Sequence, residues 1–188
     1  MVMSRNLRLV IASLLAALTA VSAYLIIPIG PVPITMQTCF VLLSGAVLGS
    51  RWGAGSQIVY ISLGLIGLPV FTNGFIGPGV FLSPTFGYIL GFVPASFITG
   101  LYLEYFRRNG VLQIMVGMLL GQFVIWMCGL IYLYLHLNTS LGIETTWRTV
   151  LAIGFFPFIP FDVVKIAIAT SIRKTLARYQ LLEPNSIK

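Results

Sequence analysis

Long apolar runs occupy most of this sequence, and they constrain the fold more than any other feature. Of the 188 residues, 58% are apolar and only 8% are charged, against about 25% charged residues in soluble domains. A helix needs about 20 apolar residues to cross a bilayer, so six helices take roughly 120 residues and leave only short loops. The sequence therefore predicts one membrane domain and excludes a water-soluble fold with a separate catalytic domain.

Six candidate spans follow from these runs, and they predict an all-α integral membrane protein. We expect a bundle of six transmembrane helices in a single domain over residues 1–188. The first run is longer than the apolar core of a signal peptide, so it is assigned as a span. The second and third runs are short, and we expect them to be tilted or embedded among other helices. The predicted spans are residues 9–27, 36–48, 54–68, 85–105, 111–135 and 150–172.

Basic residues are divided very unequally between the two sets of loops. Lysine and arginine accumulate in short loops on the cytoplasmic side, and here one side carries only Arg148 while Lys165 lies within a span. Both chain ends are therefore predicted to be cytoplasmic, with the basic C-terminal cluster among the headgroups of membrane lipids. No basic stripe follows a polar segment, so the charge does not indicate a nucleic-acid partner. The predicted cytoplasmic residues are Arg5, Arg8, Arg51, Arg107, Arg108, Arg173, Lys174, Arg178 and Lys188.

The two outward loops, residues 28–35 and 68–84, contain no charged residue. Because exposed valine, phenylalanine, isoleucine and leucine would form an apolar patch, we expect these loops to fold back over the bundle. Glycines give the second loop backbone freedom and prolines limit it, as a lid over a cavity requires. The alternative from these residues alone is a connector that lies in the membrane interface.

The most informative residues are Asp162 and Lys165, in the stretch FFPFIPFDVVKIAIA. A charge near a helix centre costs roughly 2.5 to 3.5 kcal/mol on insertion scales, so this pair needs a reason. The i, i+3 spacing puts both side chains on one helix face. Pro157 and Pro160 indicate that the helix begins near Pro160, with Asp162 in its first turn. The pair is either an internal salt bridge that locks the bundle or a polar ligand site open to the outside.

Three further polar residues are expected at a similar depth. Gln37 stands at the head of the second span, Asn73 in the second outer loop, and Tyr88 near the head of the fourth span. Together they would ring the outer mouth of a cavity, although each alone is typical of a helix end or an interface. Gln122, near the middle of the fifth span, is assigned to packing between helices.

The first span carries small residues at four-residue spacing, namely Ala12, Ala16 and Ala20. Such a ridge lets another helix approach closely. The other helix could belong to this chain, which the periodicity favours, or to a partner protein.

Motifs of catalysis and metal binding are absent from the sequence. It contains no Walker A sequence, no HExxH, no Cys/His metal cluster and no Gly-x-Ser-x-Gly. We therefore expect no catalytic residue, no metal and no cofactor. Cys39 and Cys128 lie in apolar stretches and are predicted to be buried thiols. His136, the single histidine, stands at a span end and is predicted to be solvated.

Several blocks of the sequence together resemble the BioY family, the biotin-specific substrate-binding subunits (S components) of energy-coupling factor (ECF) transporters. The resemblance covers nearly the whole chain and includes the Asp162/Lys165 pair. Its most specific blocks are PVPITMQT (31–38), LLSGAVLGSRWGA (42–54), GLIGLPVF (64–71) and SPTFGYILGF (83–92).

The resemblance implies six helices with both ends in the cytoplasm and a biotin cavity near the outer face. It assigns biotin contacts to Asp162 and Lys165, as the D-x-x-K pair of the last helix, and to Asn73. Some members place an arginine near the start of the fourth helix. This sequence has none between Arg51 and Arg107, which leaves Lys165, Tyr88 or backbone amides as candidates for the biotin carboxylate.

The resemblance also implies partners, because the chain has no means of supplying energy for uptake. These are an ECF transmembrane coupling subunit, which would dock on Ala12, Ala16 and Ala20, and two ABC-type ATPase subunits in a prokaryotic plasma membrane. A self-sufficient secondary carrier for biotin or another small carboxylate is the alternative, although such carriers more often show an internal repeat. A membrane-embedded enzyme would need more titratable partners than Asp162 and Lys165 provide.

Overall fold

The computed structural model describes residues 4–106 and 110–178. Three residues of the predicted cytoplasmic set, Arg107, Arg108 and Lys188, lie outside the described residues. The α-helices are α1 (Arg5–Ser22), α2 (Gln37–Leu48), α3 (Ser50–Leu65), α4 (Phe86–Phe106), α5 (Val111–Leu135), α6 (Trp147–Gly154) and α7 (Ile159–Arg178). The shorter elements are the strands β1 (Ile26–Ile27) and β2 (Ile34–Thr35), the 3-10 helices η1 (Thr72–Gly74) and η2 (Gly77–Leu82), and the π-helix η3 (His136–Ser140).

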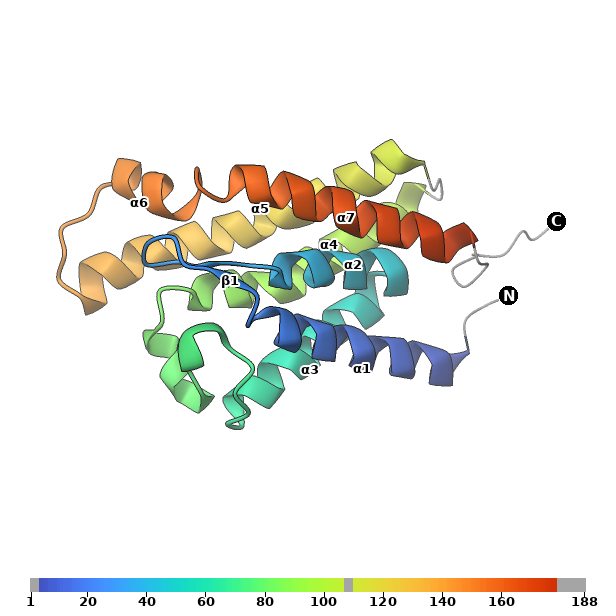
Figure 1. Cartoon of the computed structure of the whole chain (residues 1–188), viewed down its shortest axis with the longest axis horizontal. Coiled ribbons are helices and arrows are strands. Elements are labelled where there is room, and N and C mark those ends of the chain that lie inside the picture. Colours follow the sequence, from blue (N-terminus) through green and yellow to red (C-terminus); the bar gives the residue numbers. More distant parts are fainter. Residues whose placement is uncertain (1–3, 107–109, 179–188) are drawn as a thin grey trace.

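The helices form an elongated bundle, with the start of α1 and the end of α7 at the same end (Figure 1). α2 is central, because it packs against α1, α3, α4, α5 and α7. Among the described helices, α1, α4 and the stretch Val111–Ser140 are long and apolar enough to cross a membrane, and α6 with α7 makes a fourth if this bent pair is one span. The predicted all-α membrane fold is confirmed. The count of six spans stays a prediction, because α2 and α3 are short.

The first predicted span extends too far at its C-terminal end. α1 ends at Ser22, and Ile26–Ile27 instead pairs antiparallel with Ile34–Thr35. Pro28 follows directly after this strand, and a residue that precedes proline is disfavoured in the helical conformation. A short hairpin therefore replaces the last turn of the expected helix.

The last predicted span, 150–172, is divided into two helices. α6 ends at Gly154, and the chain resumes as α7 only at Ile159, at an angle of 45°. Phe155, the first residue after α6, leaves the helical conformation with φ −128° and ψ −63°. Pro160 stands in the first turn of α7, where its missing N–H leaves no bond unmade. Asp162 lies in this first turn, as predicted.

α3 begins at Ser50 rather than at the predicted Ala54, and only Gly49 separates it from α2. Gly49 has φ 82°, in the left-handed region that favours glycine. The Glu104 carboxylate at the end of α4 accepts hydrogen bonds from Ser50 N and Ser50 Oγ, both at 2.8 Å. A carboxylate satisfies free N–H groups at a helix N-terminus and is favoured there by the helix dipole. The α2–α3 turn is therefore fastened to α4.

Deeper in the bundle, α2, α3 and α4 meet through glycines and a buried polar group of side chains. A Cβ on Gly45 would lie only 2.1 Å from the Ser96 carbonyl oxygen. Ser44 Oγ and Ser96 Oγ are 2.8 Å apart, and Gln57 Nε2 donates to Ser44 Oγ and Ser56 Oγ at 3.1 Å each. We call Ser44, Ser56, Gln57 and Ser96 the serine cluster. Its neutral hydrogen bonds hold helices whose backbones only small residues allow to approach so closely.

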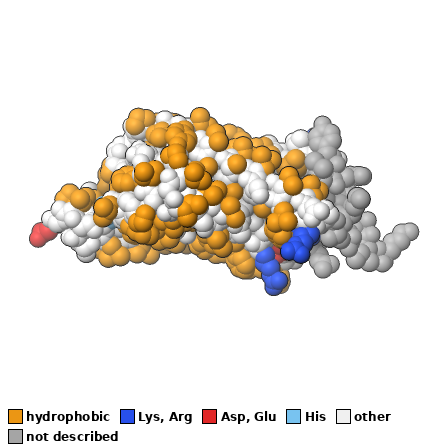
Figure 2. Space-filling view, turned by 90° about the horizontal axis from the view of Figure 1, so that it is seen from below, with side chains coloured by type: hydrophobic (Ala, Val, Ile, Leu, Met, Phe, Trp, Pro, Cys, Tyr) orange, Lys and Arg blue, Asp and Glu red, His pale blue; other side chains and the backbone are white. Residues whose placement is uncertain are grey.

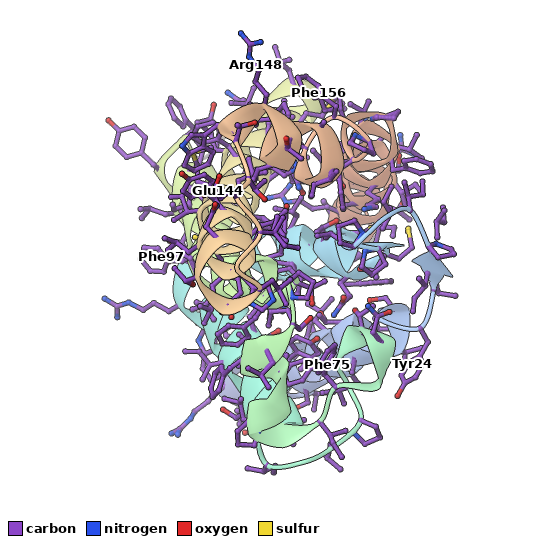
Figure 3. All side chains as sticks on the ribbon, turned by 90° about the vertical axis from the view of Figure 1, so that its left-hand side faces the viewer. Tyr24, Phe75, Phe97, Glu144, Arg148 and Phe156 are labelled. Atoms are coloured by element: carbon purple, nitrogen blue, oxygen red, sulfur yellow. The ribbon has the colours of Figure 1, made fainter. Side chains whose placement is uncertain are left out.

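The surface of the bundle is apolar along its sides and charged toward its ends. Figure 2 shows hydrophobic side chains over the middle of one face, with basic side chains near one end and an acidic side chain at the other. Arg5 and Arg178 mark the end at which α1 begins and α7 finishes. Glu144 and Arg148 lie at the opposite end (Figure 3). An apolar belt between charged ends is the surface that a bilayer requires.

Candidate functional site

A cavity opens among α2, α4, α5, α7 and the two uncharged loops. It holds about 470 Å³ of space that no atom fills, part of which is open solvent. Its polar wall is formed by Gln37, Thr38, Gln122, Asp162 and Lys165. A mostly apolar pocket with a few convergent polar groups is the usual form of a small-molecule site.

The ion pair forms the polar centre of this wall. Lys165 Nζ lies 2.8 Å from Asp162 Oδ1, and the two residues are only 4% and 1% exposed. The other carboxylate oxygen, Asp162 Oδ2, accepts hydrogen bonds from Gln122 Nε2 at 2.9 Å and from Trp126 Nε1 at 3.0 Å. We call Asp162, Lys165, Gln122 and Trp126 the cavity cluster. Gln122 and Trp126 come from α5 and the ion pair comes from α7, so hydrogen bonds to a charged group join these two helices inside the bundle.

Aromatic and aliphatic side chains form the rest of the wall. Tyr88 stacks on Phe158 with ring centroids 6.0 Å apart and an interplanar angle of 12°. Phe92 and Ile125 line the same space, as does Trp126, whose ring meets Phe155 edge to face at 4.7 Å. Rigid aromatic surfaces of this kind suit a flat apolar ring system in a ligand. The wall of the cavity therefore has one polar and one apolar side, which matches the chemistry of a ligand with the same division.

One polar atom at the cavity, Gln122 Oε1, is buried and has no hydrogen-bond partner among the described residues. A buried polar group without a partner costs free energy. This atom is therefore a candidate acceptor for a ligand.

Four of the five predicted site residues, Asp162, Lys165, Tyr88 and Gln37, line this one cavity. The Tyr88 hydroxyl donates to Gly154 O at 2.9 Å, so Tyr88 offers mainly its ring to the cavity. Asn73, the fifth, is exposed, has φ 62° and lies outside the cavity wall. Its role as a ligand contact stays a prediction.

Gln37 uses its amide to hold the loops and α3 together. Its Nε2 donates to Tyr60 Oη at 2.6 Å, and its Oε1 accepts from Thr35 Oγ1 and Thr72 Oγ1 at 3.0 Å each. Tyr60 in turn donates to Val70 O at 3.2 Å. Both ends of this amide are therefore engaged within the protein.

The two uncharged loops fold back over the bundle in part, as some of their apolar side chains are buried while others, such as Ile76 and Leu82, stay exposed. Val32, Ile34, Phe71 and Val80 are buried. Three tyrosine hydroxyls fasten the second loop, because Tyr24 donates to Pro69 O, Tyr60 to Val70 O and Tyr132 to Phe81 O. Figure 3, which looks at this end, shows Tyr24 on the same side of the molecule as Phe75 of the second loop. The loops thus close the end of the bundle at which the cavity lies.

Gln122 and Trp126 are among the site residues that were not predicted from the sequence. Gln122 was expected only to pack between helices, but it lines the cavity and donates to Asp162. The i, i+4 spacing of the two residues places both on one face of α5. This shared face was the signal that could have assigned them to the same site as the ion pair.

The alanine ridge of α1 faces the bundle. Ala16 is 2% exposed and belongs to the core, and Ala12 and Ala20 are partly buried against it. This arrangement favours the alternative of packing within the chain.

The burial of the histidine and of the two cysteines can be compared directly with the predictions. His136 is buried rather than solvated, and its ring stacks on Tyr132 with centroids 5.9 Å apart. The chain continues past α5 as η3, so His136 lies within continuous helical structure rather than at a solvent-exposed helix end. Cys39 and Cys128 are free thiols; Cys39 is buried, as predicted, while Cys128 is only partly buried.

Comparison with known proteins gives one consistent result. The BioY family model matches residues 2–180. A probable biotin transporter BioY of Lysinibacillus sphaericus is 40% identical over 89% of this chain and 84% of its own length. The biotin transporter BioY of Rhodobacter capsulatus is 39% identical over 95% of this chain and 96% of its own. A crystal structure of the S-component for biotin from an ECF-type ABC transporter matches with a TM-score of 0.84 and 27% identity, over 96% of this chain and 98% of the other.

Proposed function

Because the chain belongs to the BioY family, we propose that it is the biotin-binding S component of an ECF transporter in a prokaryotic plasma membrane. The observation that carries this proposal is the buried Asp162–Lys165 pair on the wall of a closed-over cavity. The relatives named as biotin transporters support biotin as the ligand. The structural match to a biotin S-component supports the role as the S component of an ECF transporter. The chain is a transport protein and not an enzyme.

The chemistry of biotin suits the cavity. Its ureido group carries two N–H donors and one carbonyl acceptor, while its fused sulfur ring is apolar. Lys165 has three donor hydrogens, of which Asp162 Oδ1 takes one, so it can also donate to the ureido carbonyl or to the biotin carboxylate. The rings of Tyr88 and Trp126 enclose the apolar part.

Gln37 and Asn73, the other predicted site residues, do not contact the ligand directly in this proposal. Gln37 keeps the loops over the ligand through Thr35 and Thr72. Asn73 meets the ligand only if the second loop moves, because its side chain is exposed. Candidates for the biotin carboxylate are Lys165 and backbone amides of the loops, because the single Tyr88 O–H already donates to Gly154 O.

Energy for uptake would come from partners, namely a transmembrane coupling subunit and two ABC-type ATPase subunits. Docking of the coupling subunit on Ala12, Ala16 and Ala20 stays a prediction. It requires α1 to turn or shift, since Ala16 is buried against this chain's own core.

The proposed orientation puts both chain ends in the cytoplasm and the cavity toward the outside. The distribution of basic residues supports this orientation. Single cysteines replacing Arg5 and Glu144, in a background without Cys39 and Cys128, test it with a membrane-impermeant thiol reagent. We expect labelling of intact cells at position 144 and protection at position 5, and the reverse pattern would overturn the orientation.

Uptake of radiolabelled biotin tests the proposed function. The chain is expressed in biotin-auxotrophic cells that lack their own uptake system, with and without the ATPase and coupling subunits of its own organism. We expect uptake that depends on these subunits and is lost in Asp162→Asn. Equal uptake in cells without any coupling subunit would instead favour the self-sufficient carrier.

A further inference from the structure

The orientation of the Gln122 amide follows from its partner. Asp162 Oδ1 faces the Lys165 ammonium and Oδ2 faces Trp126 Nε1, and both of these groups can only donate. Both carboxylate oxygens therefore act as acceptors, so the end of Gln122 that meets Oδ2 is its NH₂ group, 2.9 Å away. The carbonyl oxygen Gln122 Oε1 must point elsewhere.

This carbonyl oxygen is a strong acceptor in an unusual position. Gln122 is 1% exposed, its Oε1 has no partner among the described residues, and the residue lines the cavity. Gln57 in the serine cluster has the same pattern, with its Nε2 bonded and its Oε1 without a partner, but Gln57 does not line the cavity. Gln122 thus combines an unmet acceptor with a side chain that lines the cavity.

We infer that Gln122 Oε1 accepts one ureido N–H of the bound ligand, and that Asp162 also acts as a positioning residue that fixes which end of this amide faces the cavity. The inference rests on the proposed function, because it assigns the ligand an N–H donor. It makes Gln122 a specificity-determining residue. A ligand with an oxygen or a CH₂ in place of this N–H leaves a buried acceptor unpaired and is rejected for that reason.

Two ring analogues of biotin test the inference without adding bulk. In each cyclic carbamate isomer, an oxygen replaces one of the two ureido N–H groups. Affinities of biotin and both isomers are measured by calorimetry on the purified full chain in detergent, for wild type and for Gln122→Met, which has a similar shape and no amide. We expect one isomer to bind wild type at least about tenfold more weakly than biotin, and this ratio to shrink toward one in Gln122→Met.

The matched control is Gln57→Met, which removes an equally buried amide away from the cavity. We expect it to keep the wild-type ratio for both isomers. If Gln122→Met does not fold, as judged by gel filtration and thermal unfolding, Gln122→Leu removes the same amide and is judged by the same ratio.

Three results would overturn the inference, and they are distinguishable. Equal affinities of wild type for biotin and both isomers would show that neither ureido N–H is required. An unchanged isomer ratio in the folded Gln122 variant would assign the N–H to another acceptor, while the proposed function stands. Failure of wild type to bind biotin at all would overturn the proposed function and this inference with it.

Discussion

The serine cluster and the cavity cluster are both polar, buried and surrounded by the same apolar bundle, yet they differ in charge and in access. The serine cluster is neutral, joins α2, α3 and α4 beside their glycine contacts, and does not line the cavity. The cavity cluster contains an ion pair, joins α5 to α7, and borders open space. Desolvation offsets much of the attraction in a buried ion pair, so such a pair is weak evidence for a stabilising role. The difference supports the proposal that the charged cluster serves a ligand, while the neutral cluster serves packing.

The largest expected effect comes from removing the charge of the cavity cluster. Asp162→Asn leaves the Lys165 ammonium buried without a counter-charge, which costs about 3 to 5 kcal/mol when a buried pair is broken. We expect biotin affinity to fall by at least about 100-fold and the unfolding temperature in detergent to fall as well. Calorimetry and a thermal unfolding assay measure the two effects.

A double variant separates charge from ligand recognition. Asp162→Asn combined with Lys165→Met removes both charges, so we expect the unfolding temperature to recover while biotin binding does not. Wild-type affinity in either variant would reduce the pair to an internal salt bridge.

The next largest effect is expected at the glycine contacts of the serine cluster. A Cβ on Gly45 would lie 2.1 Å from the Ser96 carbonyl oxygen, which is backbone and cannot rotate away. Overpacking of this kind costs about 1 to 3 kcal/mol, so Gly45→Ala should lower the unfolding temperature while the folded fraction still binds biotin. Gly55→Ala is the matched control, since nothing lies within 4 Å of its Cβ. Equal stability of the two variants would contradict the close contact of α2 with α4.

The smallest effect is expected from the serine cluster's own hydrogen bonds. Ser96→Ala removes the 2.8 Å contact with Ser44, and interhelical hydrogen bonds in membrane proteins average about 0.6 kcal/mol. We expect a small loss of stability and a biotin affinity within about twofold of wild type. A large loss of affinity in Ser96→Ala would erase the distinction between the two clusters.

Much of the fold was predictable because the bilayer imposes strict rules on sequence. The lengths of the apolar runs and the positions of the basic residues predicted three spans whose bounds lie close to those of α2, α4 and α5. The early end of α1 was missed, although Pro28 follows it, whereas the start of α7 near Pro160 was predicted from Pro157 and Pro160. Pro28 and Pro160 mark positions where a helix is weakened, but whether it stops depends on contacts such as the pairing of β1 with β2.

The site was predictable in its charged centre and less so around it. Asp162 and Lys165 stood out because a charge in a span is costly, whereas Gln122 is a common residue for helix packing. The end of the Gln122 amide that is hydrogen-bonded is determined by Asp162, which lies 40 positions away in the sequence. The same limit applies to Gln37, whose partners Tyr60 and Thr72 come from other parts of the chain.

A crystal structure of this protein with biotin tests the central claim most directly. The account predicts the fused ring of biotin in the cavity between α4, α5 and α7, against the rings of Tyr88 and Trp126, with its ureido group toward Asp162 and Lys165. Biotin bound elsewhere on the molecule, with the Asp162–Lys165 pair closed off from it, would contradict the account.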